Sequence, residues 1–241
     1  NKSYSGFSEN VNKNIQTSAS LLYDAPFLKG LIFEGTLAYD SNNGLRKEVG
    51  KSYNVYSYDP STDTYQASKR NDPPSISNEY SDGNRLVMQL RTSYNNSFND
   101  KHNINLTAVY EQAKTWSRYA WLRRFYDFYT NDQINQASTN NQGTDGSEDE
   151  TASMSLISRA NYDYLGKYLI ELAFRYDGSY RYSPQKRWGF FPVISGGWRI
   201  SEENFIKDNF SFIDNLKLRA SYGKVGENAG NPFQYFPHHI C

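Results

Sequence analysis

The stretch YLIELAFRYD, Tyr168–Asp177, decides the fold because its side chains alternate between two kinds at every second position. One set is apolar and aromatic: Tyr168, Ile170, Leu172, Phe174 and Tyr176. The other set carries the charges: Leu169, Glu171, Ala173, Arg175 and Asp177. A helix would scatter the apolar set around its circumference, whereas a strand places the whole set on one face. The stretch therefore predicts a β-strand with one apolar face and one charged face.

Seven other segments alternate in the same way, and we expect each of them to be a strand. They are residues 14–23, 31–43, 84–97, 102–115, 151–164, 189–200 and 215–223. Most of the eight span about 9–14 residues, against about 5–6 for a strand of a soluble protein. A tilted strand needs about 9–11 residues to cross a bilayer, so the pattern favours a transmembrane β-barrel. Tyrosines near the strand ends on the apolar face fit the aromatic girdles of such barrels.

The predicted connections alternate between short and long, as they do in outer-membrane barrels. The short ones are residues 24–30, 98–101 and 165–167, and the long ones are 44–83 and 116–150. Residues 178–188 form a medium connection on the long side. Residues 201–214 lie on the short side but are too long for a simple turn, and Ser201 followed by acidic residues predicts a short helical turn with Ser201 as its N-cap.

The charged faces of the strands are expected to point into the barrel lumen. Shifting Tyr168–Asp177 by one residue would turn its charges into lipid, where an arginine at the midplane costs about 2–4 kcal/mol. The predicted lumen-facing residues are Glu34, Arg91, Glu111, Arg159, Glu171, Arg175, Lys217 and Arg219. So polar a lumen indicates a wide barrel that is hydrated or plugged.

Composition excludes several other classes of protein. The chain has 241 residues with 26 basic and 26 acidic side chains, which argues against a nucleic-acid-binding protein built on global positive charge. Its 39 aromatic residues (4 Trp, 21 Tyr, 14 Phe) argue against long-range disorder. No run of about 18 apolar residues predicts a membrane-spanning helix. The single cysteine, Cys241, has no partner for an intrachain disulfide.

No motif predicts catalysis, a cofactor or a metal. HExxH, GxSxG, Walker and CxxC patterns are absent, so we expect no catalytic residue and no enzyme. The acidic run GTDGSEDE, residues 143–150, lacks EF-hand spacing and is expected to be a solvated loop rather than a calcium site. His238, His239 and Cys241 stand in the terminal tail without a second ligand cluster, so a metal site is not expected there.

One aromatic and basic stretch is a candidate loop for contact with a ligand or a partner. Aromatic faces stack on sugar rings and on arginine side chains. The candidate residues are Trp116, Tyr119, Trp121, Arg123, Arg124, Phe125 and Tyr126. The alternative is a loop that only packs on the barrel rim.

Residues 168–236 contain a series of short motifs in a recognisable order and spacing. They are RYDGS (175–179), KRWG (186–189), FP (191–192), GWRISEE (197–203) and LKLRASYG (216–223). In this order they resemble the SusC/RagA family of TonB-linked outer-membrane transporters. The rest of the chain is compatible with that family through its tyrosine-rich strands.

The resemblance implies a cell outer membrane location and a barrel of about 22 strands with an N-terminal plug. It also implies TonB-powered import of glycans or peptides together with a SusD-like surface lipoprotein that caps the barrel. We expect residues 1–236 to form about eight strands of that barrel as an internal fragment, without the plug, and residues 237–241 to be a tail outside the match. No ligand-binding residue of the family carries over to a position here.

Two alternatives stay open from the sequence. The first is a complete eight-stranded outer-membrane barrel that acts as an anchor or adhesin, because eight strands close a small barrel. The second is a soluble carbohydrate-binding β-protein that uses the aromatic residues of 116–129.

Overall fold

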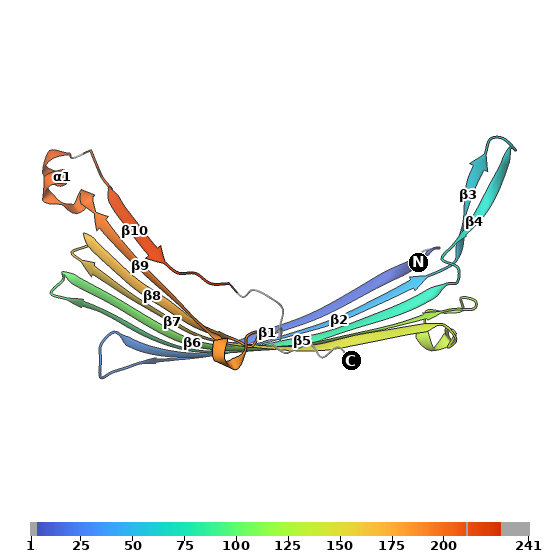
Figure 1. Cartoon of the computed structure of the whole chain (residues 1–241), viewed down its shortest axis with the longest axis horizontal. Helices are drawn as coiled ribbons and strands as arrows, with labels where there is room; N and C mark the ends of the chain where they lie inside the picture. Colours follow the sequence, from blue (N-terminus) through green and yellow to red (C-terminus); the bar gives the residue numbers. More distant parts are fainter. Residues whose placement is uncertain (1–3, 211, 228–241) are drawn as a thin grey trace. The chain divides into compact units, whose positions relative to one another are not determined.

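The computed structural model describes residues 4–210 and 212–227, and its main feature is one eight-stranded antiparallel sheet (Figure 1). The strand order is β1-β2-β5-β6-β7-β8-β9-β10. The strands are β1 (Gly6–Asp24), β2 (Leu31–Gly50), β5 (Ser75–Phe98), β6 (His102–Phe125), β7 (Gln142–Tyr164), β8 (Tyr168–Ser179), β9 (Trp188–Arg199) and β10 (Lys217–Gly223). Consecutive strands of this sheet are neighbours, as in the wall of an up-and-down barrel. The predicted all-β antiparallel architecture is confirmed.

Four connections leave the sheet at one end, which we call the turn side: residues 25–30, 99–101, 165–167 and 200–216. Asn99 and Asp100 have φ values of 51° and 52°, and Leu165 and Gly166 have 55° and 67°. Two successive residues with positive φ close tight hairpins whose twist matches that of the strands. Strand ends on this side lie within two residues of the predicted ends.

On the opposite end, which we call the loop side, most strands run farther than predicted. β1 begins at Gly6 instead of residue 14, β6 ends at Phe125 instead of residue 115, and β7 begins at Gln142 instead of residue 151. Polar residues occupy both faces of these extensions, so the alternation disappears although the backbone pairing continues. Two predictions were therefore wrong: the acidic run 143–150 lies in β7, and the aromatic stretch up to Phe125 lies in β6, not in loops.

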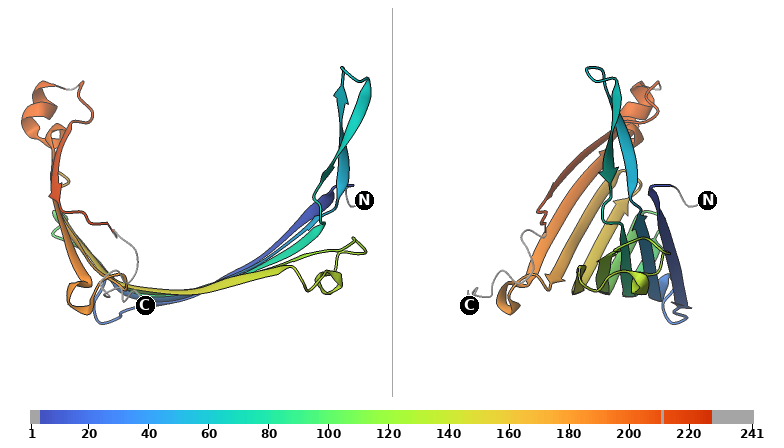
Figure 2. Two further views of the ribbon diagram at one scale, coloured as in Figure 1. Left: turned by 45° about the vertical axis from the view of Figure 1, so that its right-hand side comes forward. Right: turned by 90° about the vertical axis from the view of Figure 1, so that its right-hand side faces the viewer.

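The predicted long connection 44–83 contains a hairpin that was not predicted from the sequence. β3 (Tyr53–Asp59) and β4 (Thr64–Arg70) form a separate two-stranded sheet (Figure 2). Tyr58 pairs with Tyr65 across it, with ring centroids 5.2 Å apart. The Tyr58 hydroxyl donates a 2.8 Å hydrogen bond to Asp63, which raises the pKa of Tyr58.

The chain divides into two compact units. Unit 1 comprises Asn1–Gln16, Asp40–Arg85 and Thr115–Glu150, and unit 2 comprises Thr17–Tyr39, Leu86–Lys114 and Thr151–Cys241. Unit 1 holds a small core of buried side chains: Val49, Ile76, Tyr126 and Ala137. Its loop-side connections carry the short 3₁₀ turn η1 (Ile134–Gln136).

In unit 2 the strand register gathers apolar side chains on one face. Leu172 of β8 stands opposite Ala160 of β7 and Ile194 of β9. Leu172 is 51% exposed and Ile194 is 50% exposed, although both lie on strands with neighbours on each side. Among the described residues no second layer covers this face, so its apolar side chains have no protein core to enter.

The two remaining connections of unit 2 contain the helical elements. Between β8 and β9 lies η2 (Pro184–Lys186), and between β9 and β10 lie η3 (Ile200–Glu202) and α1 (Asn204–Asn209). The predicted helical turn is confirmed, but Ser201 is not its N-cap: Ser201 lies buried inside η3, and Glu203 precedes α1. Within residues 4–210 and 212–227, no helix is both long enough and apolar enough to cross a membrane.

Candidate functional site

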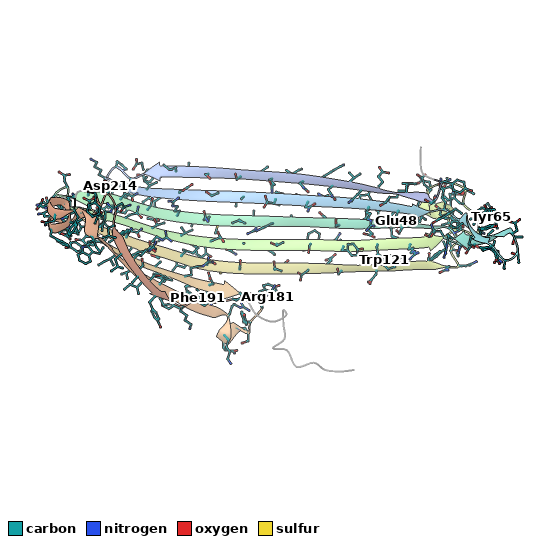
Figure 3. All side chains as sticks on the ribbon, turned by 90° about the horizontal axis from the view of Figure 1, so that it is seen from above. Glu48, Tyr65, Trp121, Arg181, Phe191 and Asp214 are labelled. Carbon is teal, nitrogen blue, oxygen red and sulfur yellow. The ribbon has the colours of Figure 1, made fainter. Side chains whose placement is uncertain are left out.

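A concavity of about 510 Å³ on the loop side brings together part of the predicted ligand stretch. Tyr119, Trp121 and Arg123 alternate along β6 and therefore share one face of the strand. Glu48 of β2 and Glu79 of β5 line the same concavity. Figure 3 shows Glu48 and Trp121 at the same end of the sheet. We call these five residues the loop-side site.

Charged groups of both signs belong to the loop-side site or pair with its residues. Arg46 lies 3.1 Å from Glu48 and 3.8 Å from Glu79, and these distances join a guanidinium nitrogen to a carboxylate oxygen. The Arg123 guanidinium lies 4.7 Å from the centroid of the Phe125 ring. Rings for stacking, next to carboxylates and guanidinium groups for hydrogen bonding, suit a ligand rich in hydroxyl or amide groups.

The other residues of the predicted ligand stretch do not join this site. Arg118 stacks on Trp116 at 4.9 Å and pairs with Glu148 at 2.7 Å. Arg124 donates a 3.5 Å hydrogen bond to the carbonyl oxygen of Ile134. Tyr126 is only 1% exposed in the core of unit 1, and burial, with a smaller contribution from Tyr129, raises its pKa to about 12. These side chains therefore support the fold of unit 1.

A second concavity, of about 610 Å³, lies on the polar face of unit 2 near the turn side. Its polar lining includes Asn95, Asn103, Asn105, Asn161, Asp163, Glu171, Ser195, Lys217 and Arg219. Asn103 donates a 3.0 Å hydrogen bond to Asp163, and Asn161 donates one of 3.4 Å to Asn105. The side-chain amides are thus arranged as a linked network across neighbouring strands.

Four of the eight predicted lumen-facing residues, Glu171, Arg175, Lys217 and Arg219, lie on this polar face. Glu171, Lys217 and Arg219 line the amide-rich concavity, and Arg159 approaches Glu171 to 4.0 Å. Arg175 lies farther along β8 and pairs with Asp177 at 3.1 Å. The strand register places Glu171 and Arg175 on the face opposite Leu172.

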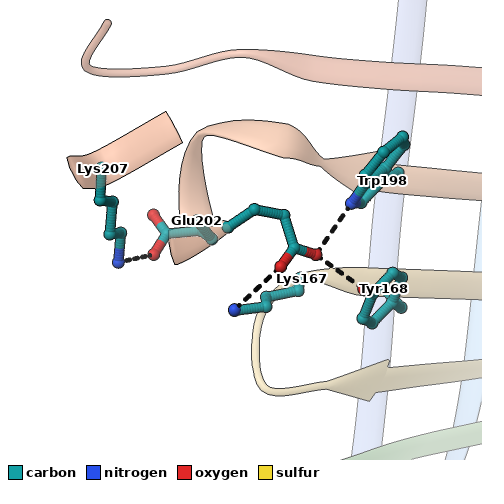
Figure 4. Close-up of polar contacts among 6 residues, drawn as sticks. Lys167, Tyr168, Trp198, Glu202 and Lys207 are labelled. Atoms are coloured by element: carbon teal, nitrogen blue, oxygen red, sulfur yellow. Dashed lines mark hydrogen bonds and ion pairs between the residues drawn. The ribbon is translucent and has the colours of Figure 1, made fainter. Parts of the chain in front are cut away.

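A cluster around Glu203 was not foreseen from the sequence (Figure 4). Its carboxylate accepts hydrogen bonds from the Tyr168 hydroxyl at 2.7 Å, from Trp198 Nε1 at 3.1 Å and from Lys167 Nζ at 3.2 Å. Trp198 is five residues from Glu203, but Tyr168 and Lys167 are 35 and 36 residues away, so no local spacing indicates these two donors. We call Glu203 and these three donors the Glu203 clasp.

The surroundings of the clasp favour ionised carboxylates. Hydrogen bonds from Tyr168, Trp198 and Lys167 lower the pKa of Glu203. The neighbouring Glu202 pairs with Lys207 at 2.7 Å, which lowers its pKa as well. Both acids of this turn are therefore matched by donors or cations.

Metal ligands do not gather in the part of the chain that the structure describes, where no group of three or more His, Cys, Asp or Glu side chains is placed to hold a metal ion. His238, His239 and Cys241 lie outside the described residues, as does the predicted tail 237–241.

The fold and its faces define a class of protein. Strands of up to 24 residues, an uncovered apolar face and an opposite face of charges and amides are the features of a transmembrane β-barrel wall.

Relatives among curated proteins narrow this class, although no family model matches the chain. TonB-dependent receptor P39 of Formosa agariphila is 40% identical over 146 residues, which are 59% of this chain and 14% of that receptor. TonB-dependent receptor SusC of Bacteroides thetaiotaomicron is 43% identical over 88 residues, 36% of this chain and 9% of SusC. The predicted resemblance to the SusC/RagA family of TonB-linked transporters is confirmed.

Solved structures agree on the fold. A structure of the RagAB peptide transporter covers 90% of this chain with a TM-score of 0.69 at 18% identity, and the chain covers 23% of it. The same importer in its closed-closed state gives a TM-score of 0.68. The sheet is thus the fold of a barrel segment from a receptor of this kind.

Proposed function

We propose that this chain is part of the barrel of an outer-membrane TonB-dependent transporter that imports glycans or peptides. Residues 1–236 would belong to the barrel domain, and the protein would act with a SusD-like surface lipoprotein and the TonB complex. Its role would be to form a wall and a polar passage, without catalysis. The similarity to SusC and to the RagAB peptide transporter supports this proposal.

The observation that carries the proposal is the uncovered apolar face of unit 2. Burying apolar surface is worth about 25 cal/mol per Å², so aliphatic side chains that stay half exposed on paired strands need another apolar environment. Lipid supplies that environment in a barrel wall. The polar face then borders the lumen, and its charges and amides meet water, plug or passing substrate.

Within this transporter, we assign ligand contact to the loop-side site. The loop-side end of β6 offers Trp121 and Tyr119 as stacking surfaces next to Arg123 and two carboxylates. Lining by aromatic rings and hydrogen-bonding groups suits both a glycan and a peptide.

Arginine substitutions on adjacent residues of β8 test the face assignment in the full-length receptor. Leu172→Arg would place a cation in lipid at a cost of about 2–4 kcal/mol and should abolish assembled barrel in outer-membrane preparations. Ala173→Arg points to the polar face and should assemble. Arg159 stands opposite Ala173, so the control carries a like-charge cost within about 1 kcal/mol, and Ala173→Glu removes that cost.

Equal assembly of Leu172→Arg and Ala173→Arg would overturn the face assignment. A receptor found free of membranes in both cases would instead support a carbohydrate-binding protein outside the membrane. If neither arginine variant assembles but Ala173→Glu does, repulsion from Arg159 explains the loss of assembly in Ala173→Arg, and the face assignment stands.

A matched pair of tryptophans tests the ligand assignment. Trp121→Ala should weaken substrate binding about 2–10-fold, since an aromatic contact is worth about 0.5–1.5 kcal/mol. Trp116→Ala removes the same ring from outside the loop-side site and should leave binding unchanged. Calorimetry of substrate binding to the purified receptor measures both variants. An equal loss of affinity in both would show that the loop-side site does not contact the ligand.

A further inference from the structure

The connection between β9 and β10 exposes a set of phenylalanines beside the Glu203 clasp. Phe205 is 53% exposed, Phe210 is 45% exposed and Phe212 is 80% exposed. The rings of Phe210 and Phe212 meet edge to face with centroids 6.1 Å apart. Ile206 of α1 is buried, so the helix turns this apolar residue inward and keeps its one aromatic residue, Phe205, outside. A cluster of exposed apolar side chains marks a contact surface for a membrane, a protein or a ligand.

The clasp ties this connection to the apolar face of the sheet rather than to the polar face. Tyr168 and Trp198 are cross-strand partners, and Trp198 also pairs with Leu218 of β10. Both donors lie on the face that carries Leu172 and Ile194, because they are an even number of residues away along β8 and β9. Glu203 binds both rings at their polar atoms, so α1 is held where the apolar face ends.

The charges of the connection are arranged for a boundary between lipid and water. A carboxylate next to an apolar surface is costly unless donors satisfy it, and Glu203 receives three hydrogen bonds. Glu202 and Lys207 neutralise each other at 2.7 Å. Tryptophan and tyrosine with their polar atoms bonded at one end are typical of the interfacial belt of membrane proteins.

We propose that α1 together with Phe210 and Phe212 forms an interfacial anchor whose phenylalanines insert into membrane phospholipid, held in place by the Glu203 clasp. The occupant of this aromatic surface is lipid because the surface continues the apolar face of unit 2. Lys167 of the clasp and the neighbouring Lys207 add two cations to this connection, and cations next to an apolar surface are typical of segments that lie in a phospholipid interface. The proposal rests on the proposed membrane insertion of the sheet, and its test separates the two.

Nitroxide labels in the full-length receptor test the anchor. Phe205→Cys is labelled in a Cys241→Ser background and reconstituted in vesicles of phosphatidylethanolamine and phosphatidylglycerol. We expect oxygen, which concentrates in lipid, to collide with this label more often than water-soluble nickel-EDDA does. Leu172→Cys is the lipid reference, and Tyr65→Cys on the β3–β4 hairpin is the aqueous reference.

Each outcome decides a different statement. Nickel-EDDA collisions at Phe205 as frequent as at Tyr65 would overturn the anchor. Low collision rates with both reagents would mean that protein covers the phenylalanines, which overturns lipid as the occupant. An aqueous Leu172 label would instead contradict the proposed function itself.

Substitution of Glu203 tests the clasp. Glu203→Ala removes all three hydrogen bonds and should raise nickel-EDDA collisions at the Phe205 label several-fold while the Leu172 label stays in lipid. Glu203→Gln keeps an acceptor for Tyr168 and Trp198 but loses the ion pair with Lys167, so an intermediate change is expected. Unchanged collision rates in a Glu203→Ala receptor that still assembles would show that the clasp does not hold the anchor.

Discussion

The two units of the chain are built from continuous strands but solve the problem of apolar side chains differently. Unit 1 buries a few, Val49, Ile76, Tyr126 and Ala137, against one another. Unit 2 leaves most of its large apolar side chains exposed on one face: Leu37, Leu86, Leu90, Leu106, Leu156, Ile170, Leu172, Ile194 and Leu218. The polar residues on both faces of the unit 1 strands suit water, whereas the exposed aliphatic residues of unit 2 suit lipid. This difference in exposed side chains indicates which part of a strand suits water and which part suits lipid.

The largest expected effect tests whether unit 1 relies on its own core. Tyr126→Ala removes a ring that is 1% exposed and should cost about 3–5 kcal/mol of local stability. Limited proteolysis of the assembled receptor should then cut within residues 126–141, while barrel assembly in the membrane continues. Loss of assembly instead would mean that the core of unit 1 is needed for the fold of unit 2.

The next effect compares the same substitution in both units. Ile194→Arg on the apolar face of unit 2 should lose about 2–4 kcal/mol and fail to assemble. Val55→Arg in the β3–β4 hairpin is similarly exposed in the structure, 43% against 50%, and should assemble like the unsubstituted receptor. Heat-modifiable migration in gels measures assembly, and equal behaviour of the two variants would erase the contrast between the units.

A smaller effect is expected at two glycines that occupy equivalent strained positions. Gly30 has φ +88° and Gly6 has φ +124°, and an added Cβ would meet the carbonyl oxygen of Asn95 or Val49, respectively. Each alanine substitution should cost about 1–3 kcal/mol. We expect Gly30→Ala to slow assembly because it strains a turn of unit 2, and Gly6→Ala to increase only protease sensitivity near Val49. Slow assembly of Gly6→Ala, with only protease sensitivity changed in Gly30→Ala, would contradict these expectations for the two units.

The smallest effect is a pH dependence of the Glu203 clasp. The pKa of Glu203 is lowered below its ordinary value of 4.5 by Tyr168, Trp198 and Lys167. The stabilisation by the ionised carboxylate is therefore fully present above that value and is lost as the pH falls through the lower, folded-state pKa. A nitroxide at Phe205→Cys should keep its mobility at neutral pH and gain mobility only in acid, and Glu203→Gln should weaken this transition. A transition near neutral pH would contradict the assignment to Glu203.

The sequence predicted the turn-side half of each strand well because alternation is strict there. Apolar side chains that share one face of a strand must return at every second residue, as Ile170 and Leu172 do. On the loop side that requirement ends, so the extensions of β1 and β7 carried no alternating pattern. The β3–β4 hairpin was missed although Pro60 and Asp63 stand in its turn, since a stretch rich in polar residues resembles a loop.

Candidate site residues were less predictable than the strands. The aromatic stretch around Trp121 was recognised by composition. Composition does not show that Trp121 and Trp116 lie on opposite faces of β6, which follows from the alternation of side chains along the strand. Glu48 and Glu79 of the loop-side site come from other strands, and no spacing in the sequence links them to β6. Glu203 likewise depends on donors that the fold brings together. The register between neighbouring strands decides which charged side chains meet. The alternation within a single strand does not reveal this register.

The orientation of the apolar face toward lipid is tested most directly by a nitroxide scan of β8 from Leu169 to Tyr176 in the full-length receptor, reconstituted in vesicles and read by collision with oxygen. We expect high oxygen accessibility at Ile170, Leu172 and Phe174, and low accessibility at Glu171, Ala173 and Arg175. Equal accessibility at adjacent residues, or alternation in the opposite phase, would contradict the assignment of the apolar face to lipid.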